Sequence, residues 1–216
     1  MDNIYALVER SSYNMDKLIM SELNKNPIKQ FQIWLEEALQ TDMPEPTAMN
    51  LATCTYEGKV SSRMVLLKNF DNRGFVFHTN YESKKAEDIN ANAQAALCFW
   101  WGDLERQVRI EGAIEKVSAK ESDEYFSSRP RDSQIGAIAS KQSAVIDHYQ
   151  TLRDQVALIE KQYQSKQKIP RPEFWGGYRV IPETIEFWQG RPSRLHDRLR
   201  YKKSANGKWE IERLSP

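Results

Sequence analysis

The stretch Ala48–Lys68, AMNLATCTYEGKVSSRMVLLK, decides the fold of this chain. Two runs rich in apolar and β-branched residues, Ala48–Thr55 and Lys59–Lys68, flank the tripeptide Tyr56-Glu57-Gly58. A short segment that contains glycine between two such runs is the signal of a β-hairpin. The sequence therefore predicts that the chain enters a sheet here as an antiparallel pair of strands.

The same pattern continues towards the C-terminus, where turn signals such as Asp71-Asn72-Arg73-Gly74 and Ala205-Asn206-Gly207 separate short apolar runs. Further strands are predicted over Phe75–Thr79, Gln94–Trp101, Leu104–Val117, Phe174–Val180, Thr184–Trp188, Arg198–Lys203 and Lys208–Leu214. About eight strands at hairpin spacing, with few βαβ alternations, favour an antiparallel barrel with peripheral helices over a doubly wound parallel sheet. The expected class is mainly β with peripheral helices, an α+β fold.

Helices are predicted between these strands. Asn26-Pro27 supplies an N-cap and a proline at the first helical position, and apolar residues then recur at helical spacing over 28–40. Ser83 can cap a helix over 84–91, Ser118 can cap one over 119–127, and an amphipathic segment covers roughly 143–166. Residues 1–25 are polar and weakly patterned, so they are expected to form a mobile arm before a single domain over 26–216.

Composition limits the classes of function. The chain has 216 residues, 40% of them hydrophobic, with 31 Lys and Arg against 30 Asp and Glu. A net charge of +1 argues against bulk nucleic-acid or membrane-surface binding, which use a broad cationic field. The N-terminus lacks signal-peptide features, no apolar run is long enough to span a bilayer, and Cys54 and Cys98 are isolated in sequence. These features predict a cytoplasmic protein that binds neither nucleic acid nor membrane.

Several chemical signatures are missing from the sequence. There is no Gly-x-Gly-x-x-Gly or Gly-x-x-x-x-Gly-Lys-Ser/Thr motif, and no Gly-x-Ser-x-Gly motif. The histidines His78, His148 and His196 lie far apart, without cysteine or carboxylate partners at metal-ligand spacing, so no metal site is predicted.

Cations instead gather in four clusters. Arg191, Arg194, His196 and Arg198 follow an aromatic run within Glu186–Arg198. Such density on one turn is repulsive unless an anion lies among the cations, and guanidinium suits phosphate and carboxylate. The alternative, which requires no ligand, is that Asp197 pairs with one arginine while the others are solvated.

The second cluster, Ser83-Lys84-Lys85 after His78-Thr79, opens a predicted helix. Lysines in a first helical turn oppose the macrodipole, whereas a bound anion would reverse the sign of that interaction and use the free backbone N–H groups. The sequence favours an anion site here.

The remaining two clusters are less distinctive. Arg63 and Lys68 bracket an apolar strand and could simply be solvated at its ends. Tyr125–Gly136, continuing to Ser143, combines arginine, serine and glutamine in a predicted loop, as phosphate sites do, although Asp132 could pair with an arginine in a purely structural turn. The polar residues of Leu104–Arg109 fit a pocket lining or an exposed face equally well.

At these clusters the chain resembles the pyridoxine (pyridoxamine) 5′-phosphate oxidase family. The matching stretches, in family order, are Arg63-Met-Val-Leu-Leu-Lys68, Leu104-Glu-Arg-Gln107-Val, Ser128-Arg-Pro-Arg-Asp-Ser-Gln-Ile-Gly136, Ser140-Lys-Gln-Ser143, Phe174-Trp-Gly-Gly177, Ile185-Glu-Phe-Trp-Gln-Gly190 and Arg194-Leu-His-Asp-Arg198. They extend from about residue 27 to the C-terminus, so the resemblance is nearly full length.

The resemblance implies an FMN-binding split β-barrel that forms a homodimer with FMN at the subunit interface. It implies oxidation of the 4′ carbon of pyridoxine 5′-phosphate or pyridoxamine 5′-phosphate to give pyridoxal 5′-phosphate. FMN would accept the hydride, and O2 would reoxidise the flavin with release of H2O2.

The resemblance also implies roles for particular residues. For the cofactor they are Arg63, Met64, Val65, Leu66, Leu67, Lys68, His78, Thr79, Ser83, Lys84, Lys85, Gln107, Gln142, Ser143, Trp188 and Arg198. For the substrate they are Arg10, Tyr13, Lys68, Tyr125, Arg129, Ser133, Arg194 and His196, with Arg194 and His196 also as the catalytic pair over the substrate ring. His78 departs from the tyrosine that the family often has before Thr79, and Arg191 falls in a variable part of its loop.

Two other functions compete with this one. A non-catalytic split-barrel relative would bind flavin or pyridoxal phosphate only as a carrier or sensor, which the presence of Arg194 and His196 beside the phosphate ligands disfavours. Nucleic-acid binding would use the arginine clusters and the six tryptophans, which the near-zero net charge disfavours.

Overall fold

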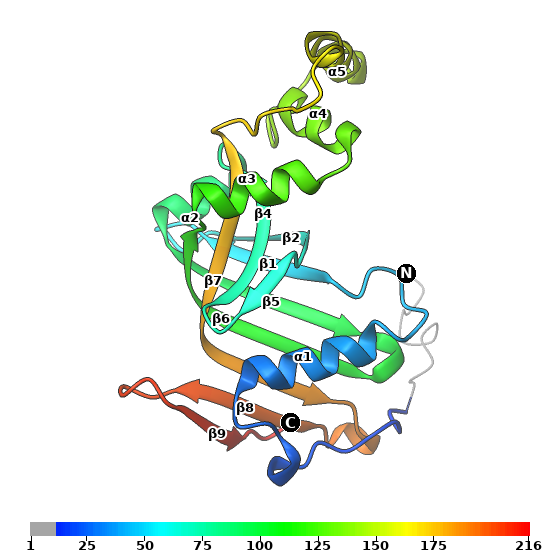
Figure 1. Cartoon of the computed structure of the whole chain (residues 1–216). Helices are drawn as coiled ribbons and strands as arrows, with labels where there is room; N and C mark the ends of the chain where they lie inside the picture. Colours follow the sequence, from blue (N-terminus) through cyan, green and yellow to red (C-terminus); the bar gives the residue numbers. More distant parts are fainter. Residues whose placement is uncertain (1–11) are drawn as a thin grey trace, which may run out of the picture. The chain divides into compact units, whose positions relative to one another are not determined.

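The structure, a computed structural model, describes residues 12–216. In this part of the chain the strands are β1 (Ala48–Cys54), β2 (Val60–Leu66), β3 (Asn69–Asp71), β4 (Gly74–Asn80), β5 (Gln94–Trp101), β6 (Arg106–Lys116), β7 (Trp175–Gln189), β8 (Asp197–Lys203) and β9 (Trp209–Arg213) (Figure 1). The helices are α1 (Pro27–Ala38), α2 (Lys84–Ala91), α3 (Ala119–Ser128), α4 (Arg131–Ala139) and α5 (Tyr149–Tyr163). Short 3-10 turns cover Met20–Glu22, Gly102–Leu104 and Pro192–Arg194.

The described strands form one nine-stranded sheet with the hydrogen-bonded order β2-β1-β5-β6-β7-β4-β3, and β8 joins β7 and β9. The predicted hairpin is confirmed, because β1 and β2 pair antiparallel from Ala48 opposite Leu66 to Cys54 opposite Val60. The β3–β4, β4–β7, β7–β8 and β8–β9 pairs are antiparallel as well. The predicted class, mainly β with peripheral helices, is therefore correct.

One long strand replaces two of the predicted ones. The sequence suggested a break at Pro182, but β7 runs through it without interruption. Its first part pairs with β4 up to Val180, and its last part pairs with β8 from Thr184 onwards. Pro182 lies between these two ladders, where its missing N–H group interrupts neither of them.

Two helical predictions need correction. The segment expected to be a loop between helices contains α4, which begins after Pro130 and buries Gln134 and Ile135. The amphipathic helix expected over 143–166 is shorter, because α5 begins only at Tyr149. Ser143 has a left-handed φ of 73°, a conformation that a helix through this residue does not allow.

Side-chain caps explain where two of the helices, α1 and α3, begin. Asn26 Oδ1 accepts from the N–H of Ile28 at 2.8 Å, and Ser118 forms a reciprocal capping box with Glu121. The predicted cap at α2 is wrong in its chemistry. The Ser83 hydroxyl donates to the carbonyl of Asn80 at 2.8 Å, while the N–H of Lys84 donates to Ser143 Oγ at 3.2 Å.

The described chain divides into two compact units. The first comprises residues up to Pro46, Cys98–Ile110 and Glu183–Pro216, and the second comprises Thr47–Leu97 and Glu111–Pro182. Strands β5, β6 and β7 each contribute residues to both units. The prediction of a mobile arm over 1–25 is not tested, although Leu18 is buried and residues 20–22 form a 3-10 turn.

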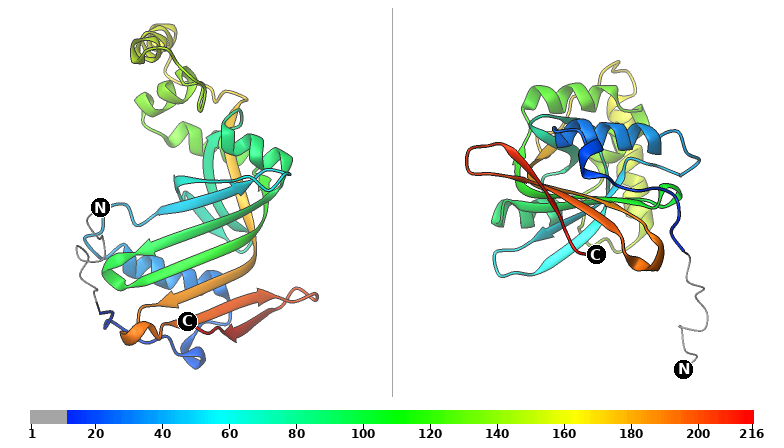
Figure 2. Two further views of the ribbon diagram at one scale, coloured as in Figure 1. Left: turned by 180° about the vertical axis from the view of Figure 1, so that it is seen from behind. Right: turned by 90° about the horizontal axis from the view of Figure 1, so that it is seen from below.

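The first unit has an aromatic core beneath α1. Phe31 packs on Phe99 with ring centroids 5.1 Å apart, and Trp34 meets Phe187 edge-on at 5.0 Å. The Arg106 guanidinium lies 4.5 Å from the ring of Trp34, which covers the edge of this core. The β8–β9 hairpin belongs to the same unit and ends near the C-terminus (Figure 2).

The second unit has two apolar clusters. Met49 and Leu51 of β1 are fully buried, as are Phe75 and Phe77 of β4. A separate cluster joins the helices α3 and α4 to the start of β7, and its buried members are Phe126, Ile135, Ile169 and Trp175. This second cluster fixes α3 and α4 relative to the start of β7, next to the candidate site.

Candidate functional site

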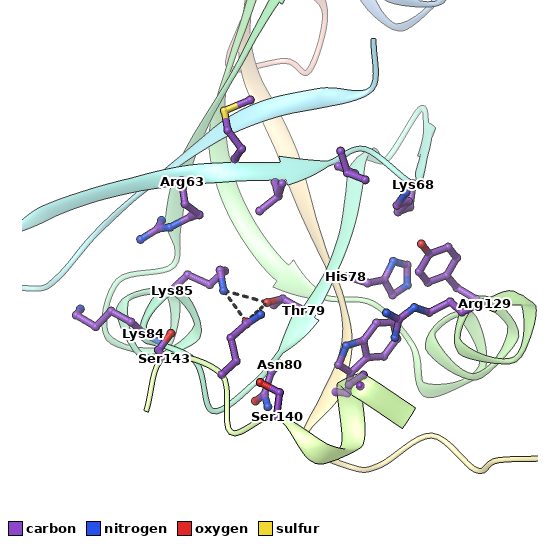
Figure 3. A pocket seen from close by; sticks show the side chains of 18 residues that line it. Arg63, Lys68, His78, Thr79, Asn80, Lys84, Lys85, Arg129, Ser140 and Ser143 are labelled. Carbon is purple, nitrogen blue, oxygen red and sulfur yellow. Dashed lines mark hydrogen bonds between the residues drawn. The ribbon is translucent and has the colours of Figure 1, made fainter. Parts of the chain in front are cut away.

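A pocket of about 670 Å³ lies in the second unit. It is lined by β2, β4, the start of α2, α3, α4, the segment 140–143 and Trp175, and many of its side chains are cationic. Figure 3 shows two groups of polar side chains, with Arg63, Lys84, Lys85 and Ser143 on one side and Lys68, His78 and Arg129 on the other.

The centre of the first group is Lys85, which is only 8% exposed. Its Nζ donates to Gln142 Oε1 at 2.7 Å and to Thr79 Oγ1 and Ser83 Oγ at 3.1 Å each. These partners are all neutral, and within residues 12–216 Lys85 forms no ion pair. Burial, followed by repulsion from Arg63, lowers the pKa of Lys85 to about 8. A buried amine without a carboxylate partner is suited to an anionic ligand.

Arg63, on β2, lies on the same side of the pocket as Lys85, and its side chain is 22% exposed. Its Nη1 donates to Thr53 Oγ1 at 2.7 Å, and its Nη2 donates to Ser61 Oγ at 2.6 Å. Burial lowers the pKa of Arg63, but arginine remains charged at any physiological pH. Lys84 adds a third cation, paired with Asp88 one turn along α2. This ion pair gives Lys84, one of the two lysines at the start of α2, a structural role that requires no ligand.

The second group is built on stacked rings. His78 stacks on Tyr125 with centroids 4.0 Å apart, and the Arg129 guanidinium lies 4.7 Å from the ring of Trp175. Arg129 Nη1 and both ring nitrogens of His78 are buried and make no hydrogen bond within the described chain. Burial, then the charges of Arg129 and Lys68, lower the pKa of His78 to about 4, so His78 is neutral at pH 7.

The two groups place cationic side chains at two separate positions in the pocket. One offers the ammonium of Lys85 and the guanidinium of Arg63, and the other offers Lys68 and an arginine with an unsatisfied N–H group. Buried donors without partners carry a desolvation penalty of roughly 1–3 kcal/mol, which a phosphate oxygen removes. The lining therefore fits one molecule with two phosphates or two phosphate esters side by side.

The pocket brings together most of the predicted site residues of the second unit. Those that line it are Arg63, Met64, Val65, Leu66, Lys68, His78, Thr79, Lys84, Lys85, Tyr125, Arg129, Gln142 and Ser143. Ser83 is fully buried behind the lining, where it hydrogen-bonds the lining residues Lys85 and Asn80. Leu67 is 5% exposed and belongs to the core, and Ser133 on α4 is half-buried outside the lining.

The other predicted residues belong to the first unit, where several of them form a second group. The ring of Trp188 lies 4.5 Å from that of His196, and Tyr13 meets both rings edge-on at 5.7 and 5.6 Å. The N–H of Arg191 donates to Nδ1 of His196 at 3.1 Å. In the neutral ring the proton is therefore on Nε2. Burial, then Arg194, lower the pKa of His196.

The cations of this loop differ in how free they are. Arg198 is held by Glu186 through two hydrogen bonds of 2.7 and 3.1 Å, and Asp197 pairs with both Arg213 and Arg191. Among the described residues the Arg194 side chain makes no ion pair or hydrogen bond, and it is exposed. Arg194 has a φ of 62°, a left-handed backbone that costs about 1–2 kcal/mol outside glycine. Gln107 is half-buried on β6, and Arg10 lies outside the described residues.

Sequence reasoning missed five lining residues, namely Asn80, Gly136, Ala137, Ser140 and Trp175. The sequence contained a signal for Trp175, because this residue belongs to the family motif Phe174-Trp-Gly-Gly177. Asn80 lines the pocket from the end of β4, and Gly136, Ala137 and Ser140 line it from α4 and its C-terminal end, where the sequence pattern has no clear helical signal.

The antiparallel sheet carries a pocket whose cationic lining is chemically suited to phosphorylated ligands. Residues 35–163 match the family model described as pyridoxamine 5′-phosphate oxidase. Residues 175–216 match the model of the pyridoxine 5′-phosphate oxidase C-terminal dimerisation region. The chain therefore belongs to the pyridoxamine 5′-phosphate oxidase family.

Full-length relatives agree with this assignment. The chain is 55% identical over 207 residues to a pyridoxine/pyridoxamine 5′-phosphate oxidase of Gloeothece citriformis, with 96% of each chain covered. It is 52% identical to the protein of the same name from Synechocystis, with 100% of both chains covered.

Solved structures share the fold. PhzG from Burkholderia lata, in complex with tetrahydrophenazine-1-carboxylic acid, superposes with a TM-score of 0.87 and 30% identity over 94% of this chain and 99% of that one. An FMN-binding protein from Nostoc punctiforme superposes with a TM-score of 0.67 at 14% identity, over 93% of this chain and 100% of that one, which supports the fold alone.

Proposed function

We propose that this protein uses FMN to oxidise pyridoxine 5′-phosphate and pyridoxamine 5′-phosphate to pyridoxal 5′-phosphate, with O2 as electron acceptor and H2O2 as product. The observation that carries the proposal is that one pocket contains two separate groups of cations. Cofactor and substrate are both phosphate monoesters, so each group would have a phosphate to bind. In one group, Lys85 is buried and has only neutral partners among the described residues. In the other, Nη1 of Arg129 is buried without a hydrogen-bond partner in the described chain. Each group therefore has its own reason to bind a phosphate.

The roles of the residues follow from these positions. Arg63, Lys84 and Lys85 would hold the phosphate of FMN, and Lys68, Tyr125 and Arg129 would hold the phosphate of the substrate. Bound FMN supplies the hydride acceptor, and the protein orients the reacting carbon towards it. Arg194 would bind the substrate ring, because its guanidinium has no protein partner within the described chain. His196, neutral with its proton on Nε2, would donate a hydrogen bond to the substrate.

We also propose a homodimer with FMN at the subunit interface, and a cytoplasmic location. The match of residues 175–216 to a dimerisation region supports the homodimer. No helix within residues 12–216 combines the length and the apolar character needed to cross a membrane. Light scattering of the FMN-loaded protein should give twice the monomer mass of 25.2 kDa.

The direct test is an anaerobic titration of the FMN-loaded protein with each phosphate ester. Both esters should bleach the flavin absorbance, and subsequent air should restore it with release of H2O2. Flavin binding without bleaching by either ester would instead support a carrier or sensor. Pyridoxine without its phosphate is the matched control, since it lacks the group that Lys68 and Arg129 are proposed to bind.

The affinity for FMN should depend on pH through Lys85. Below its pKa of about 8 the amine is already protonated in the free protein. Above that pKa, binding of the phosphate dianion must take up a proton, so Kd should rise up to about tenfold per pH unit. Fluorescence titration between pH 7 and 9.5 measures this rise. Lys85→Met should bind FMN weakly at every pH with a flat profile, and the same upward bend in Lys85→Met would contradict the assignment to Lys85.

A further inference from the structure

A buried carboxylate lies behind the first group of cations. Asp88 is on α2, and its side chain is 1% exposed. Its Oδ2 accepts hydrogen bonds from Thr53 Oγ1 and from Ser61 Oγ, both at 2.8 Å, and its Oδ1 accepts from Lys84 Nζ. Burial alone would raise the pKa of Asp88, but the hydrogen bonds from Lys84, Ser61 and Thr53 outweigh it and lower the pKa, so Asp88 is ionised.

The two hydroxyl groups that contact Asp88 also hold Arg63. Arg63 Nη1 lies 2.7 Å from Thr53 Oγ1, and Nη2 lies 2.6 Å from Ser61 Oγ. A hydroxyl has one proton, and each of these hydroxyls gives it to the carboxylate. Their lone pairs are then free to accept from the guanidinium, so the hydrogen bonds run in one direction from Arg63 through the hydroxyls to Asp88.

Asp88 attracts the guanidinium of Arg63 electrostatically but makes no direct hydrogen bond with it. The nearest carboxylate oxygen is 3.9 Å from Arg63 Nη2, which is beyond hydrogen-bond distance. Arg63 Nη1 also donates to the carbonyls of Leu51 and Ser61 at 3.1 and 3.2 Å. Of the five N–H groups of a guanidinium, the Nε–H and one Nη2–H therefore remain for a ligand.

We propose that Asp88, through the hydroxyls of Thr53 and Ser61, positions the guanidinium of Arg63 for the phosphate of FMN. The proposal rests on the FMN-binding function proposed above. Arginine has a long side chain, and ordering it costs conformational entropy. The hydroxyl relay orders the side chain already in the free protein, so ligand binding does not have to order it. Asp88, Thr53 and Ser61 are positioning residues, and of these four side chains only that of Arg63 contacts the phosphate.

The test compares FMN with riboflavin, which lacks the phosphate, by fluorescence titration of the full-length protein. The ratio of the two Kd values isolates the contribution of the phosphate. The variant Thr53→Val with Ser61→Ala removes the relay but no charge, and the ratio should change by about tenfold in favour of riboflavin, as loss of supporting hydrogen bonds commonly does. Thr151→Val with Ser127→Ala, two exposed positions, is the matched control and should keep the wild-type ratio.

Two further measurements separate positioning from other effects. In an Arg63→Ala background the relay substitutions should change the ratio by less than about twofold, because they act through Arg63. Asp88→Ala removes a negative charge near the phosphate, which by Coulomb's law alone would strengthen FMN binding, whereas the relay predicts weaker binding. Circular dichroism identifies variants that fail to fold.

The outcomes are distinct. An unchanged ratio in the relay variant, or equal changes with and without Arg63, would overturn the relay while the FMN site stands. A wild-type ratio in Arg63→Ala would overturn the assignment of Arg63 to the phosphate, and the relay with it. Failure of the wild-type protein to bind FMN would refute the proposed function itself.

Discussion

Arg194→Ala is expected to lower kcat by about 10²-fold or more and to change the Kd for FMN by less than about threefold. Arg194 is exposed in the loop between β7 and β8, without a protein partner among the described residues. Its left-handed backbone is retained at an energetic cost, which is a frequent property of functional loops. A guanidinium held in this way is free to bind the substrate ring in the transition state, and alanine removes it without disturbing a structural ion pair.

Steady-state kinetics at saturating FMN, combined with a flavin titration, measures both quantities. Arg194→Lys should recover only part of kcat, because an ammonium lacks the planar fork of donors. Arg200→Ala is the matched control, since Arg200 lies on β8 and pairs with Glu212 in a partly exposed ion pair. Such a pair is worth about 1 kcal/mol or less, so kcat should be unchanged. Loss of flavin from Arg194→Ala as severe as from Arg63→Ala would contradict the roles assigned to both arginines.

Arg63→Ala is expected to show the reverse pattern. The Kd for FMN should rise by a factor that corresponds to about 2–4 kcal/mol, the cost of removing one partner of a partly buried charge-assisted contact. The Kd for riboflavin should change by less than about threefold, and kcat at saturating FMN should fall only slightly. The reason is the position of Arg63, which is held by Thr53 and Ser61 on the side of the pocket where Lys84 and Lys85 also lie.

Flavin fluorescence gives both dissociation constants, and Arg73→Ala is the matched control. Arg73 pairs with Asp71 and Glu121 on the surface of the same unit and does not line the pocket. If Arg63→Ala weakened FMN and riboflavin binding equally, Arg63 would support the flavin pocket as a whole and would not contact the phosphate.

The elements that the sequence predicted well are those with a strong local signal. The hairpin around Tyr56-Glu57-Gly58 and the caps at Asn26 and Ser118 each depend on a few neighbouring residues, and all three are present. The α4 helix was missed because its pattern is weak, with Gly136 in its middle and only Gln134 and Ile135 buried. Its stability comes from packing against Phe126 and Trp175, which neighbouring residues in the sequence do not reveal.

The candidate site shows the same division. Clusters of cations marked Arg63, Lys85 and Arg129, and the resemblance assigned them to phosphates, but no pattern in the sequence indicated Asp88 or Thr53. The density of cations in Glu186–Arg198 did not show which of its arginines pair with carboxylates. In the structure Arg198 forms an ion pair with Glu186, and Arg191 forms one with Asp197. The Arg194 side chain has no partner in the described chain.

By itself, the sequence determined the class of fold, the hairpin around Tyr56-Glu57-Gly58 and the kinds of residue that are proposed to bind the ligands. These depend on local propensity, apolar periodicity and side-chain chemistry, which are properties of short segments. Only the tertiary structure decided which cations are already neutralised by carboxylates and which remain available to a ligand. That distinction depends on distances between segments far apart in the chain, such as the 2.7 Å between Lys85 Nζ and the neutral amide oxygen of Gln142.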